Sequence, residues 1–394
     1  MLPQTDGFIP LSTPWLVGRE REYLLECIDS GWVAAGPYID KFEDAVAQRV
    51  GSVGAVAVSS GTAALHVALH LLGVGSGDAV LCPTLTFVAT TNSIVYTGAR
   101  PVFLDSEPTT MGIDPASLRK FLENQCNVNS AGTVTDKVTG LRIKALVVVH
   151  LYGHPADMDP ILEISREYGF PVVEDATESL GSLYHDRPTG SMGLIGCFSF
   201  NGNKTITSGG GGMIVSADED LISRSRSLIN QAKGAGSEFF HSEMGFNYRL
   251  SNLHAAVGLA QFERLEDFLA ARRGHAQRYA EALSEVPGIT FCTEQPWARS
   301  NYWLSTILVD PEVTGITTDK IMKTLGDLGI EVRRPFVPNH QLPPYQNDQT
   351  AGNLDSAVSL YQRGLNLPSS GWLSSAQLDR VVEEFTLAIE NSSS

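Results

Sequence analysis

The segment Ile195–Lys204, IGCFSFNGNK, carries an apolar run directly into a polar turn that ends in a lysine. The run Ile195–Phe200 is short and bounded by turn-forming residues, as expected for a strand buried inside a sheet. Four glycines, Gly209–Gly212, follow the lysine and introduce another apolar run, Gly212–Ser216. The segment therefore predicts two core strands with a lysine between them.

Runs of the same kind precede this segment. They are Ala55–Ser59, Ala79–Cys82, Pro101–Leu104, Ala145–His150 and Pro171–Glu174. Stretches with helical patterns separate them, among them Thr62–Leu72, Val88–Tyr96 and Met158–Tyr168. This alternation predicts an α/β fold in which helices cover both faces of one sheet. The polar segment Asn127–Arg142 predicts a surface hairpin inserted before a core strand.

The pattern changes after Ser251, a plausible N-cap for a long helix. An apolar stripe at helical spacing follows it, formed by Leu253, Val257, Ala260, Leu265 and Phe268. We expect this helix to lead into a smaller C-terminal domain. The predicted division is a large domain over residues 1–260 and a small domain over residues 261–394, with the N-terminal segment packed on the small domain.

Composition excludes several classes of protein. The 394 residues carry a formal net charge of −16, which argues against a general nucleic-acid binder because phosphate backbones need a basic face. The five cysteines are far apart and form no CxxC pair, which predicts no disulfide framework and no metal site. We see no secretory signal and no apolar run long enough to span a bilayer, so we expect a cytoplasmic enzyme away from the membrane.

The first feature with a chemical role is Ser59–Leu65, SSGTAAL. A strand ends at Ser59 and a helix begins near Thr62, so the free N–H groups of the first helical turn can hold a phosphate. Gly61 allows a close approach of the backbone. A plain helix N-cap with no ligand is the alternative interpretation of these residues.

The second feature is Val172–Ala176, VVEDA, in which β-branched residues run into carboxylates at a strand end. A carboxylate such as Asp175 can hold a protonated heterocyclic nitrogen at this edge of a sheet. The alternative is an aspartate that caps the next loop.

The third feature is Lys204 in its polar turn. A lysine delivered by a buried strand can lose its proton and form a Schiff base with an aldehyde. The alternative is a solvated surface lysine, whereas a P-loop is excluded because the lysine precedes the glycines. A phosphate cradle, an acid for a pyridine nitrogen and a Schiff-base lysine on one sheet together predict a site for pyridoxal 5′-phosphate (PLP).

At these residues the chain resembles the DegT/StrS family of nucleotide-sugar aminotransferases from about Pro10 to Ile389. The motifs are Asp29–Trp32, Ser59–Ala64, Thr84–Thr90, Glu174–Ala176, Ser199–Lys204 and Gly245–Arg249. The resemblance implies a type I aminotransferase fold, with a mixed, mostly parallel seven-stranded sheet and a smaller C-terminal α/β domain. It also implies homodimers with shared active sites that move an amino group from glutamate to a keto carbon of a nucleotide-linked sugar.

The resemblance also implies roles for individual residues at the cofactor. Lys204 is the Schiff-base lysine and the general acid and base, and Asp175 pairs with the pyridine nitrogen. Gly61, Thr62 and Ser199 hold the phosphate, Phe87 stacks over the ring (or is a core aromatic), and Asn247 reaches the partner subunit's phosphate (or is a turn-forming asparagine). Ser60 and Asn203 are further cofactor contacts. Glu178 stands where many members have glutamine, next to the O3′ atom of the ring or the sugar.

Substrate contacts are expected from Trp32, Ala34, Tyr248, Arg249, Arg333 and His340, with Arg334 as a further candidate for the sugar diphosphate. Ordinary surface pairing of the arginines and a structural role for His340 are the alternatives. Within the family the chain looks closest to the branch that aminates C4 of UDP-4-keto-6-deoxy-N-acetylhexosamines, as in bacillosamine and legionaminate synthesis. The matching features are Asn201–Lys204, the insert before Lys144, Ser300–Thr306 and Asn366–Ser369.

Other functions remain open at this point. A GDP-perosamine type or dTDP-keto-sugar aminotransferase shares most of the motifs. A non-catalytic regulator that binds PLP or a nucleotide sugar would belong to another class. Lys204 argues against a sugar dehydratase with histidine at this place, and the missing glycine fingerprint argues against an NAD-dependent oxidoreductase.

Overall fold

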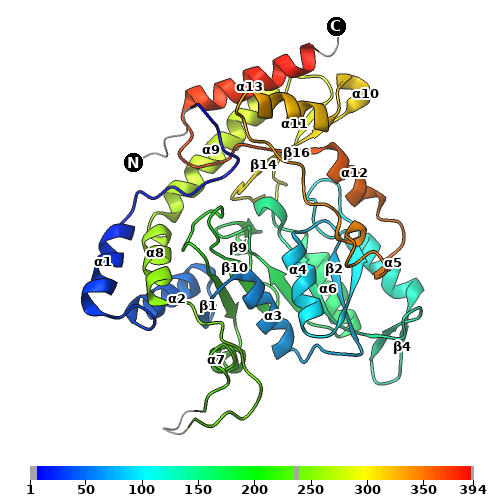
Figure 1. The fold of residues 1–394 in the computed structure, drawn as a ribbon. Helices are drawn as coiled ribbons and strands as arrows, with labels where there is room; N and C mark the ends of the chain where they lie inside the picture. The colour runs from blue at the N-terminus through cyan, green and yellow to red at the C-terminus, as the bar shows by residue number, and fades with distance from the viewer. Residues whose placement is uncertain (1–6, 235–238, 392–394) are drawn as a thin grey trace.

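A ten-stranded sheet lies at the centre of the computed structural model, which describes residues 7–234 and 239–391 (Figure 1). Eight strands follow one another across it in the order β1 (Gly54–Val58), β11 (Gly212–Ser216), β10 (Ile195–Ser199), β7 (Val172–Asp175), β6 (Arg142–Val149), β2 (Asp78–Pro83), β3 (Arg100–Leu104) and β15 (Gln349–Thr350). Along this path β11 is antiparallel to both neighbours and the other pairs are parallel. The seven expected strands all lie in this sheet, and its mixed, mostly parallel character is confirmed, but the expected number of seven strands is too low by three.

The inserted hairpin is also confirmed. Its strands are β4 (Cys126–Val128) and β5 (Val134–Asp136), which pair antiparallel, and β5 also pairs with the start of β6. The buried Asp136 side chain accepts an N–H···O bond of 3.0 Å from Thr139 in the turn before β6. This local bond fixes the turn that returns the chain to the sheet.

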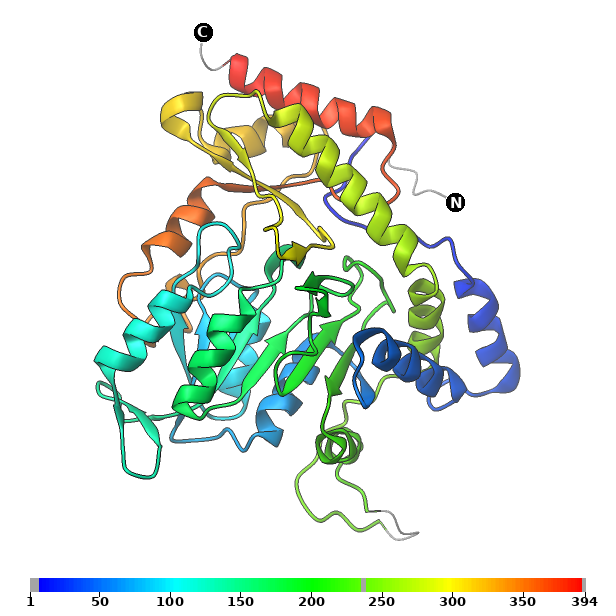
Figure 2. The same cartoon turned by 180° about the vertical axis from the view of Figure 1, so that it is seen from behind.

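Helices cover both faces of the sheet (Figures 1 and 2). On one face lie α3 (Gly61–Leu71), α4 (Val88–Tyr96) and α7 (Glu219–Leu228), and on the other lie α5 (Pro115–Gln125) and α6 (Met158–Tyr168). Leu65 and Leu69 of α3 are fully buried in one cluster with Val147. Each such leucine contributes about 1.5–3 kcal/mol by leaving water, so the sheet is held between two apolar layers.

A third group of helices packs beside β1, namely α1 (Glu20–Ser30), α2 (Pro37–Val50) and α8 (Asn252–Phe262). Ser251 is the N-cap of α8, because its hydroxyl accepts a bond from the N–H of His254. The prediction of one long helix after Ser251 is wrong in one respect, since the structure divides this segment into α8 and α9 (Leu265–Leu283). Arg264 lies between them with non-helical φ and ψ of −108° and 11°.

The apolar stripe gives no sign of this break, because residues on both sides of it face the same cluster. Leu259 of α8 and Leu265 of α9 both pack there. The change of direction lets α9 leave the large sheet and run along a second sheet (Figure 2). The guanidinium of Arg264 donates to the carbonyl of Val17, which ties the break to the N-terminal segment.

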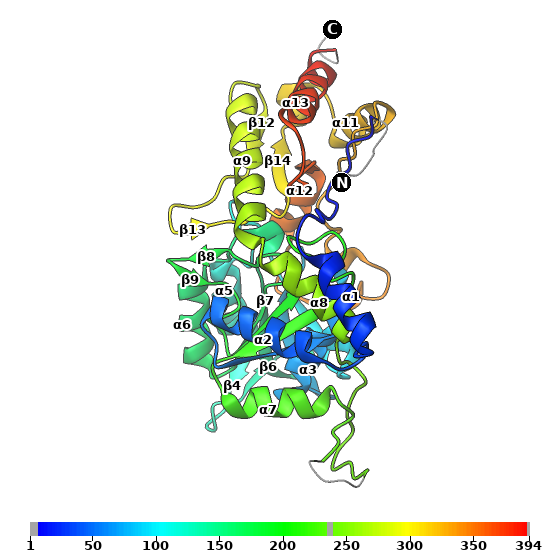
Figure 3. The same cartoon turned by 90° about the vertical axis from the view of Figure 1, so that its left-hand side faces the viewer.

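The second sheet consists of β12 (Ile289–Phe291), β14 (Ser305–Val309) and β16 (Gly364–Leu367), all antiparallel. It packs with α9, α11 (Thr318–Asp327) and α13 (Ser375–Glu390) around one apolar cluster (Figure 3). Ile9 belongs to that cluster, and its N–H donates to the carbonyl of Gly329. The domain boundary after residue 260 falls inside α8 and stays a prediction.

A buried arginine joins segments of this region that are distant in the sequence. The Arg272 side chain on α9 donates to the carbonyls of Trp303 and Ser369, at 2.8 and 2.6 Å, and to the hydroxyl of Ser12 at 3.4 Å. Arg272 is 3% exposed. Burial lowers its pKa to about 10, so the guanidinium depends on these oxygen acceptors for its stability.

The remaining elements are short. They are η1 (Leu151–Gly153), β8 (Leu183–Tyr184), β9 (Arg187–Pro188), β13 (Ala298–Arg299), α10 (Pro311–Thr314), η2 (Asn339–Gln341) and α12 (Asp355–Arg363). In the described part of the chain, every helix is too short or too polar to cross a membrane.

Candidate active site

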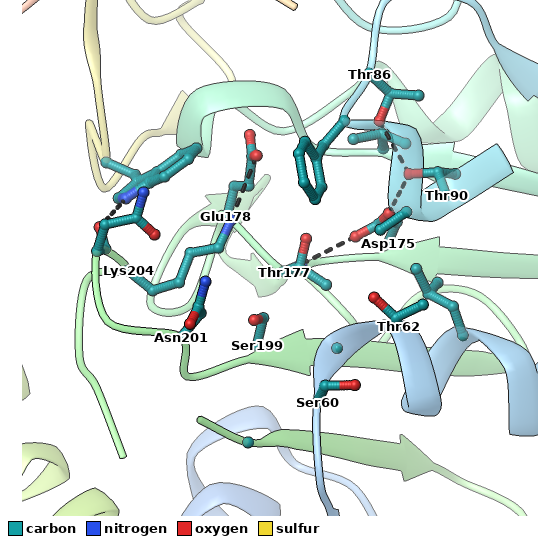
Figure 4. Close-up of a pocket in the computed structure, with 18 of the residues that line it drawn as sticks. Ser60, Thr62, Thr86, Thr90, Asp175, Thr177, Glu178, Ser199, Asn201 and Lys204 are labelled. Carbon is teal, nitrogen blue, oxygen red and sulfur yellow. Dashed lines mark hydrogen bonds and ion pairs between the residues drawn. The ribbon is translucent and has the colours of Figure 1, made fainter. Parts of the chain in front are cut away.

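A pocket of about 420 Å³ opens where β7 and β10 end and where α3 and α4 begin (Figure 4). Its lining comes from the ends of five strands of the large sheet, β1, β2, β6, β7 and β10, and from two segments of the C-terminal region, around Trp303 and Arg333. Parallel strands bring their carboxyl ends to one edge, and this edge is where open α/β sheets bind ligands. The size fits a small organic molecule.

Lys204 lies in this pocket, in the turn that follows β10. Its backbone N–H donates to the carbonyl of Asn201 at 3.1 Å, which closes the turn. Its Nζ atom lies 3.4 Å from Oε1 of Glu178 and 3.9 Å from the centre of the Trp303 ring. The side chain is 12% exposed, so the alternative of a solvated surface lysine is wrong.

Asp175 ends β7 on the neighbouring strand and is 3% exposed. Its Oδ2 atom accepts a 2.7 Å bond from the hydroxyl of Thr90, and its Oδ1 atom accepts a 3.2 Å bond from the N–H of Thr177. The second bond means that Asp175 also caps the next turn, as the alternative interpretation held. Asp175 and Lys204 both line the pocket, where a ligand can contact each of them (Figure 4).

The start of α3 forms another part of the pocket. The Ser60 hydroxyl caps the helix by accepting a 3.1 Å bond from the N–H of Ala63, so the N-cap interpretation is correct for Ser60 itself. Gly61, Thr62 and Ser199 line the pocket beside it. A Cβ atom on Gly61 would lie 2.8 Å from Cβ of Ser199, so only glycine fits between α3 and β10.

An aromatic residue, Phe87, lines the pocket at the start of α4. It is 52% exposed, which excludes a core aromatic, and its ring centre lies 5.5 Å from that of Phe336. Asn203 also lines the pocket. Its carbonyl accepts bonds from the indole N–H of Trp303 at 2.6 Å and from the hydroxyl of Ser12 at 2.9 Å, which ties the Lys204 turn to the C-terminal and N-terminal segments.

Glu178 lies in the same pocket and is 4% exposed. Its Oε2 atom accepts a 2.8 Å bond from the N–H of Tyr152. Burial raises the pKa of the Glu178 carboxyl above its ordinary value, while Lys204 and the Tyr152 N–H act in the opposite direction. The adjacent ammonium is therefore an important stabiliser of the charged carboxylate.

Three of the four cationic or imidazole candidates for substrate binding lie in different surroundings. Arg333 lines the pocket. Arg334 instead pairs with Asp319, with Nη2 2.9 Å from Oδ1, so the alternative of surface pairing holds for it. Nδ1 of His340 lies 2.7 Å from the hydroxyl of Thr84, and His340 is not part of the pocket lining.

The other expected contacts do not line the pocket of this chain. They are Trp32, Ala34, Asn247, Tyr248 and Arg249. Trp32 is 59% exposed, whereas Tyr248 is half-buried and its hydroxyl lies 3.3 Å from Nδ1 of His66. The carbonyl of Tyr248 accepts a 2.7 Å bond from the N–H of Ser59, directly beside the phosphate cradle. The roles expected for this group in binding substrate or a second subunit stay predictions.

Several lining residues have no role in the sequence analysis. They are Thr86, Thr90, Thr177, Asn201, Trp303 and Phe336. Thr86 and Thr90 lie within the motif Thr84–Thr90, and their four-residue spacing at the start of a helix is the signal that could have placed both hydroxyls on one side. The approach of Trp303 to Lys204 joins residues 99 positions apart, and a single sequence carries no direct sign of it.

Comparison with known proteins agrees with this site. The DegT/DnrJ/EryC1/StrS aminotransferase family matches residues 15–386. EpsN of Bacillus subtilis (strain 168), whose name describes it as a pyridoxal phosphate-dependent aminotransferase, is 42% identical over 95% of this chain and 94% of EpsN. GDP-perosamine synthase of Caulobacter vibrioides is 39% identical over 95% of this chain and 96% of that enzyme.

Among solved structures, S. venezuelae DesV in complex with a ketimine intermediate has a TM-score of 0.83 and is 30% identical, covering 94% of each chain. The similarity therefore extends over both sheets rather than over one motif. Because the family match and these relatives span nearly the whole sequence, this chain belongs to the DegT/DnrJ/EryC1/StrS aminotransferase family and is a PLP-dependent sugar aminotransferase.

Proposed function

We propose that this enzyme transfers an amino group from glutamate to the C4 keto carbon of a nucleotide-linked 4-keto-6-deoxy sugar, with Lys204 as the catalytic acid and base. One observation carries the proposal. Lys204 and Asp175 come from adjacent strands, are both largely buried and face one pocket with the start of α3. A shielded amine and a shielded carboxylate at neighbouring strand ends are the two groups needed to hold the aldehyde and the ring nitrogen of PLP.

The groups in the pocket match the chemistry of PLP. When bound, PLP supplies an aldehyde and a pyridinium ring that accepts electrons. Asp175 is the residue that would hold the protonated ring nitrogen, and Lys204 is the residue that would bond the aldehyde. Gly61, Thr62 and Ser199 offer N–H and hydroxyl groups to the phosphate, and the positive end of the α3 dipole favours an anion there.

Lys204 would move the proton in both halves of the reaction. Its amine would take the proton from the α-carbon of glutamate and would later give a proton to C4 of the sugar. The side chain is 12% exposed, so bulk water competes little for that proton. The backbone N–H of Lys204 donates to the carbonyl of Asn201, which fixes the turn from which the side chain projects.

Arg333 is our candidate for binding the sugar diphosphate. It lines the pocket, and its buried Nε atom has no hydrogen-bond partner among the described residues. An unpaired buried donor is costly, and a phosphate oxygen would remove that cost. The protein as a whole is acidic, so a local cation is needed to attract an anionic sugar nucleotide.

Two sugar nucleotides are candidates. A UDP-linked 4-keto-6-deoxy-N-acetylhexosamine is our first choice, on the motifs that resemble the branch acting on it. GDP-4-keto-6-deoxymannose is the second, since the Caulobacter relative named GDP-perosamine synthase is 39% identical. Both substrates carry the ketone at C4, so the reaction is the same.

The test is a panel of UDP-, GDP- and dTDP-linked keto sugars with nitrogen-15 glutamate, followed by mass spectrometry of the sugar. We expect labelled amine in one sugar and none with Lys204→Ala, which retains the rest of the pocket. No transfer to any of these sugars, in protein that binds PLP, would refute the proposed substrate class. Transfer at the wild-type rate by Lys204→Ala would refute the role of Lys204.

We also propose that the enzyme is a homodimer with shared active sites. After α7, the described residues 229–234 and 239–247 extend away from the sheet (Figures 1 and 3), and they include Phe239 and Met244, which are 83% and 74% exposed. Trp32 and Val33 expose further apolar surface at the end of α1. A second subunit that covers these surfaces would remove apolar area from water and bring Asn247 close to a neighbouring pocket.

A further inference from the structure

The amine of Lys204 lies between a carboxylate and an aromatic face. Glu178 lies 3.4 Å away and the centre of the Trp303 ring 3.9 Å away. Both partners are buried, at 4% and 2% exposed. A carboxylate and an aromatic face each favour the protonated form of an amine, so the pair is suited to an ammonium group.

A strained residue fixes Glu178. The Tyr152 N–H donates to its Oε2 atom at 2.8 Å, which leaves Oε1 for Lys204. Tyr152 has a φ of 54°, a left-handed conformation that is unfavourable for a tyrosine. Backbone strain of this kind persists where the surrounding structure imposes it, often at functional sites.

A second strained residue precedes Trp303. Tyr302 has a φ of 47°. Trp303 is then held at both ends, because its indole N–H donates to the carbonyl of Asn203 at 2.6 Å and its backbone N–H donates to the side chain of Asn301 at 2.8 Å.

Asn301 links the two partners of the amine. Its amide group donates to the carbonyl of Glu178 at 3.0 Å, while its oxygen accepts the bond from Trp303. The carboxylate and the ring are therefore positioned relative to each other by one buried side chain.

The other charged groups of the pocket are Asp175 on β7 and Arg333. The Tyr152 hydroxyl faces the same region, and burial raises its pKa well above the ordinary value, so it stays neutral at physiological pH. Glu178 is the acid whose ion pair with Lys204 is seen in the structure.

We propose that Glu178 and Trp303 form a holding site for the ammonium group of Lys204, occupied whenever this amine is not bonded to the cofactor. The proposal rests on the function proposed above, which requires Lys204 to be free in part of the cycle. It also gives a reason for glutamate at position 178, where many relatives are expected to have glutamine. A neutral amide could accept a hydrogen bond but could not offset the charge of a buried ammonium.

The test measures the reactivity of the Lys204 amine rather than turnover. Full-length protein, freed of cofactor and separately loaded with pyridoxamine phosphate, is labelled with trace acetic anhydride at pH 8 and analysed by peptide mass spectrometry. Only the unprotonated amine reacts, so loss of the holding site should accelerate labelling. We expect Lys204 to be labelled about tenfold faster in Glu178→Gln, because removing a nearby opposite charge has an effect of about that size or more.

Two tryptophan variants separate the ring from its hydrogen bond. Trp303→Phe keeps an aromatic face, so acetic anhydride should label Lys204 in this variant at nearly the wild-type rate. Trp303→Leu removes the aromatic face, so Lys204 in this variant should be labelled several-fold faster than in wild type. If Trp303→Leu does not fold, Trp303→Phe and Glu178→Gln still decide the matter. Lys323, paired with Asp327 on the surface, is the internal control and should react equally in all variants.

Equal labelling of Lys204 in wild type and Glu178→Gln, with unchanged thermal melting, overturns the holding site even if the enzyme transaminates normally. Faster labelling in Glu178→Gln supports it even if no sugar is aminated. The two proposals can therefore fail independently.

Discussion

The hydroxyl of Thr90 donates a 2.7 Å hydrogen bond to Oδ2 of Asp175, and both side chains are buried. Thr90 is in the first turn of α4 and Asp175 ends β7, so the bond joins two separate connections of the sheet. A donor favours the charged form of a carboxylate, which is the form needed to hold a protonated ring nitrogen.

Replacing Thr90 with valine should therefore weaken PLP binding. A hydrogen bond to a charged group contributes about 1.5–3 kcal/mol, so we expect affinity to fall by about tenfold or more. Absorbance titration with PLP measures it. Ser93→Ala is the matched control, since Ser93 is buried on the same helix but donates to the carbonyl of Thr90. Equal affinity in the two variants would show that the bond to Asp175 has no such role.

Gly61→Ala should disturb the start of α3. The new methyl group would lie 2.8 Å from Cβ of Ser199 and 3.0 Å from Cγ2 of Thr177, so α3 must move away from β10. We expect a loss of about 1–3 kcal/mol of unfolding free energy and weaker binding of PLP. Urea unfolding and PLP titration measure the two effects. Gly274→Ala on α9, where nothing lies within 4 Å of the added carbon, should leave both unchanged or raise stability slightly.

The shared site can be tested by mixing two inactive variants. Each proposed site takes Lys204 from one subunit and Asn247 from its partner. A heterodimer of Lys204→Ala and Asn247→Ala would therefore contain one site in which both residues are intact. After subunit exchange we expect about a quarter of wild-type activity, as random pairing into twofold dimers requires. The control mixture, Lys204→Ala with Asp175→Asn, damages the same subunit's site and should stay inactive. Absence of recovery in dimers proven to exchange would place Asn247 outside the partner's site.

Acid should destabilise the protein through His275. Burial, together with Arg272 and Arg278, lowers the pKa of His275 to about 4 from 6.5. The unfolded chain therefore binds the proton of His275 more tightly than the folded protein does. This preference does not affect the free energy of unfolding well above pH 6.5, and it lowers that free energy progressively as the pH falls from 6.5 towards 4. Between pH 7 and pH 5 we expect wild type to lose about 1–2 kcal/mol more than His275→Gln, measured by urea unfolding. Parallel losses in both proteins would contradict this assignment.

The sequence predicts the large sheet well because its signals are local. Runs such as Ile195–Phe200 are short, apolar and bounded by turn residues, and burial on both faces leaves them few other structures. The end of α8 at Phe262 could not be predicted, since the apolar stripe continues in phase through the break. That break depends on contacts with the N-terminal segment, which periodicity does not report.

The residues of the site also fall into those that the sequence predicts and those that it does not. Lys204, Asp175 and Gly61 stand at strand or helix ends that the sequence marks, and the structure brings them to one pocket. Trp303 lies beside Lys204 only because the second sheet folds over the first, so its place required the structure. Contacts expected from Asn247 involve a second copy of the chain, and a single subunit does not contain them.

The carbonyl of Asn203 has consequences beyond the pocket. It accepts bonds from Ser12 and from the indole of Trp303, and the buried Arg272 holds both of those residues from α9. The position of the catalytic turn thus depends on the packing of a layer that contains none of the reacting groups. Directed evolution for heat resistance in that distant layer would therefore select on reaction speed at the same time, and screens for the two traits should find overlapping substitutions.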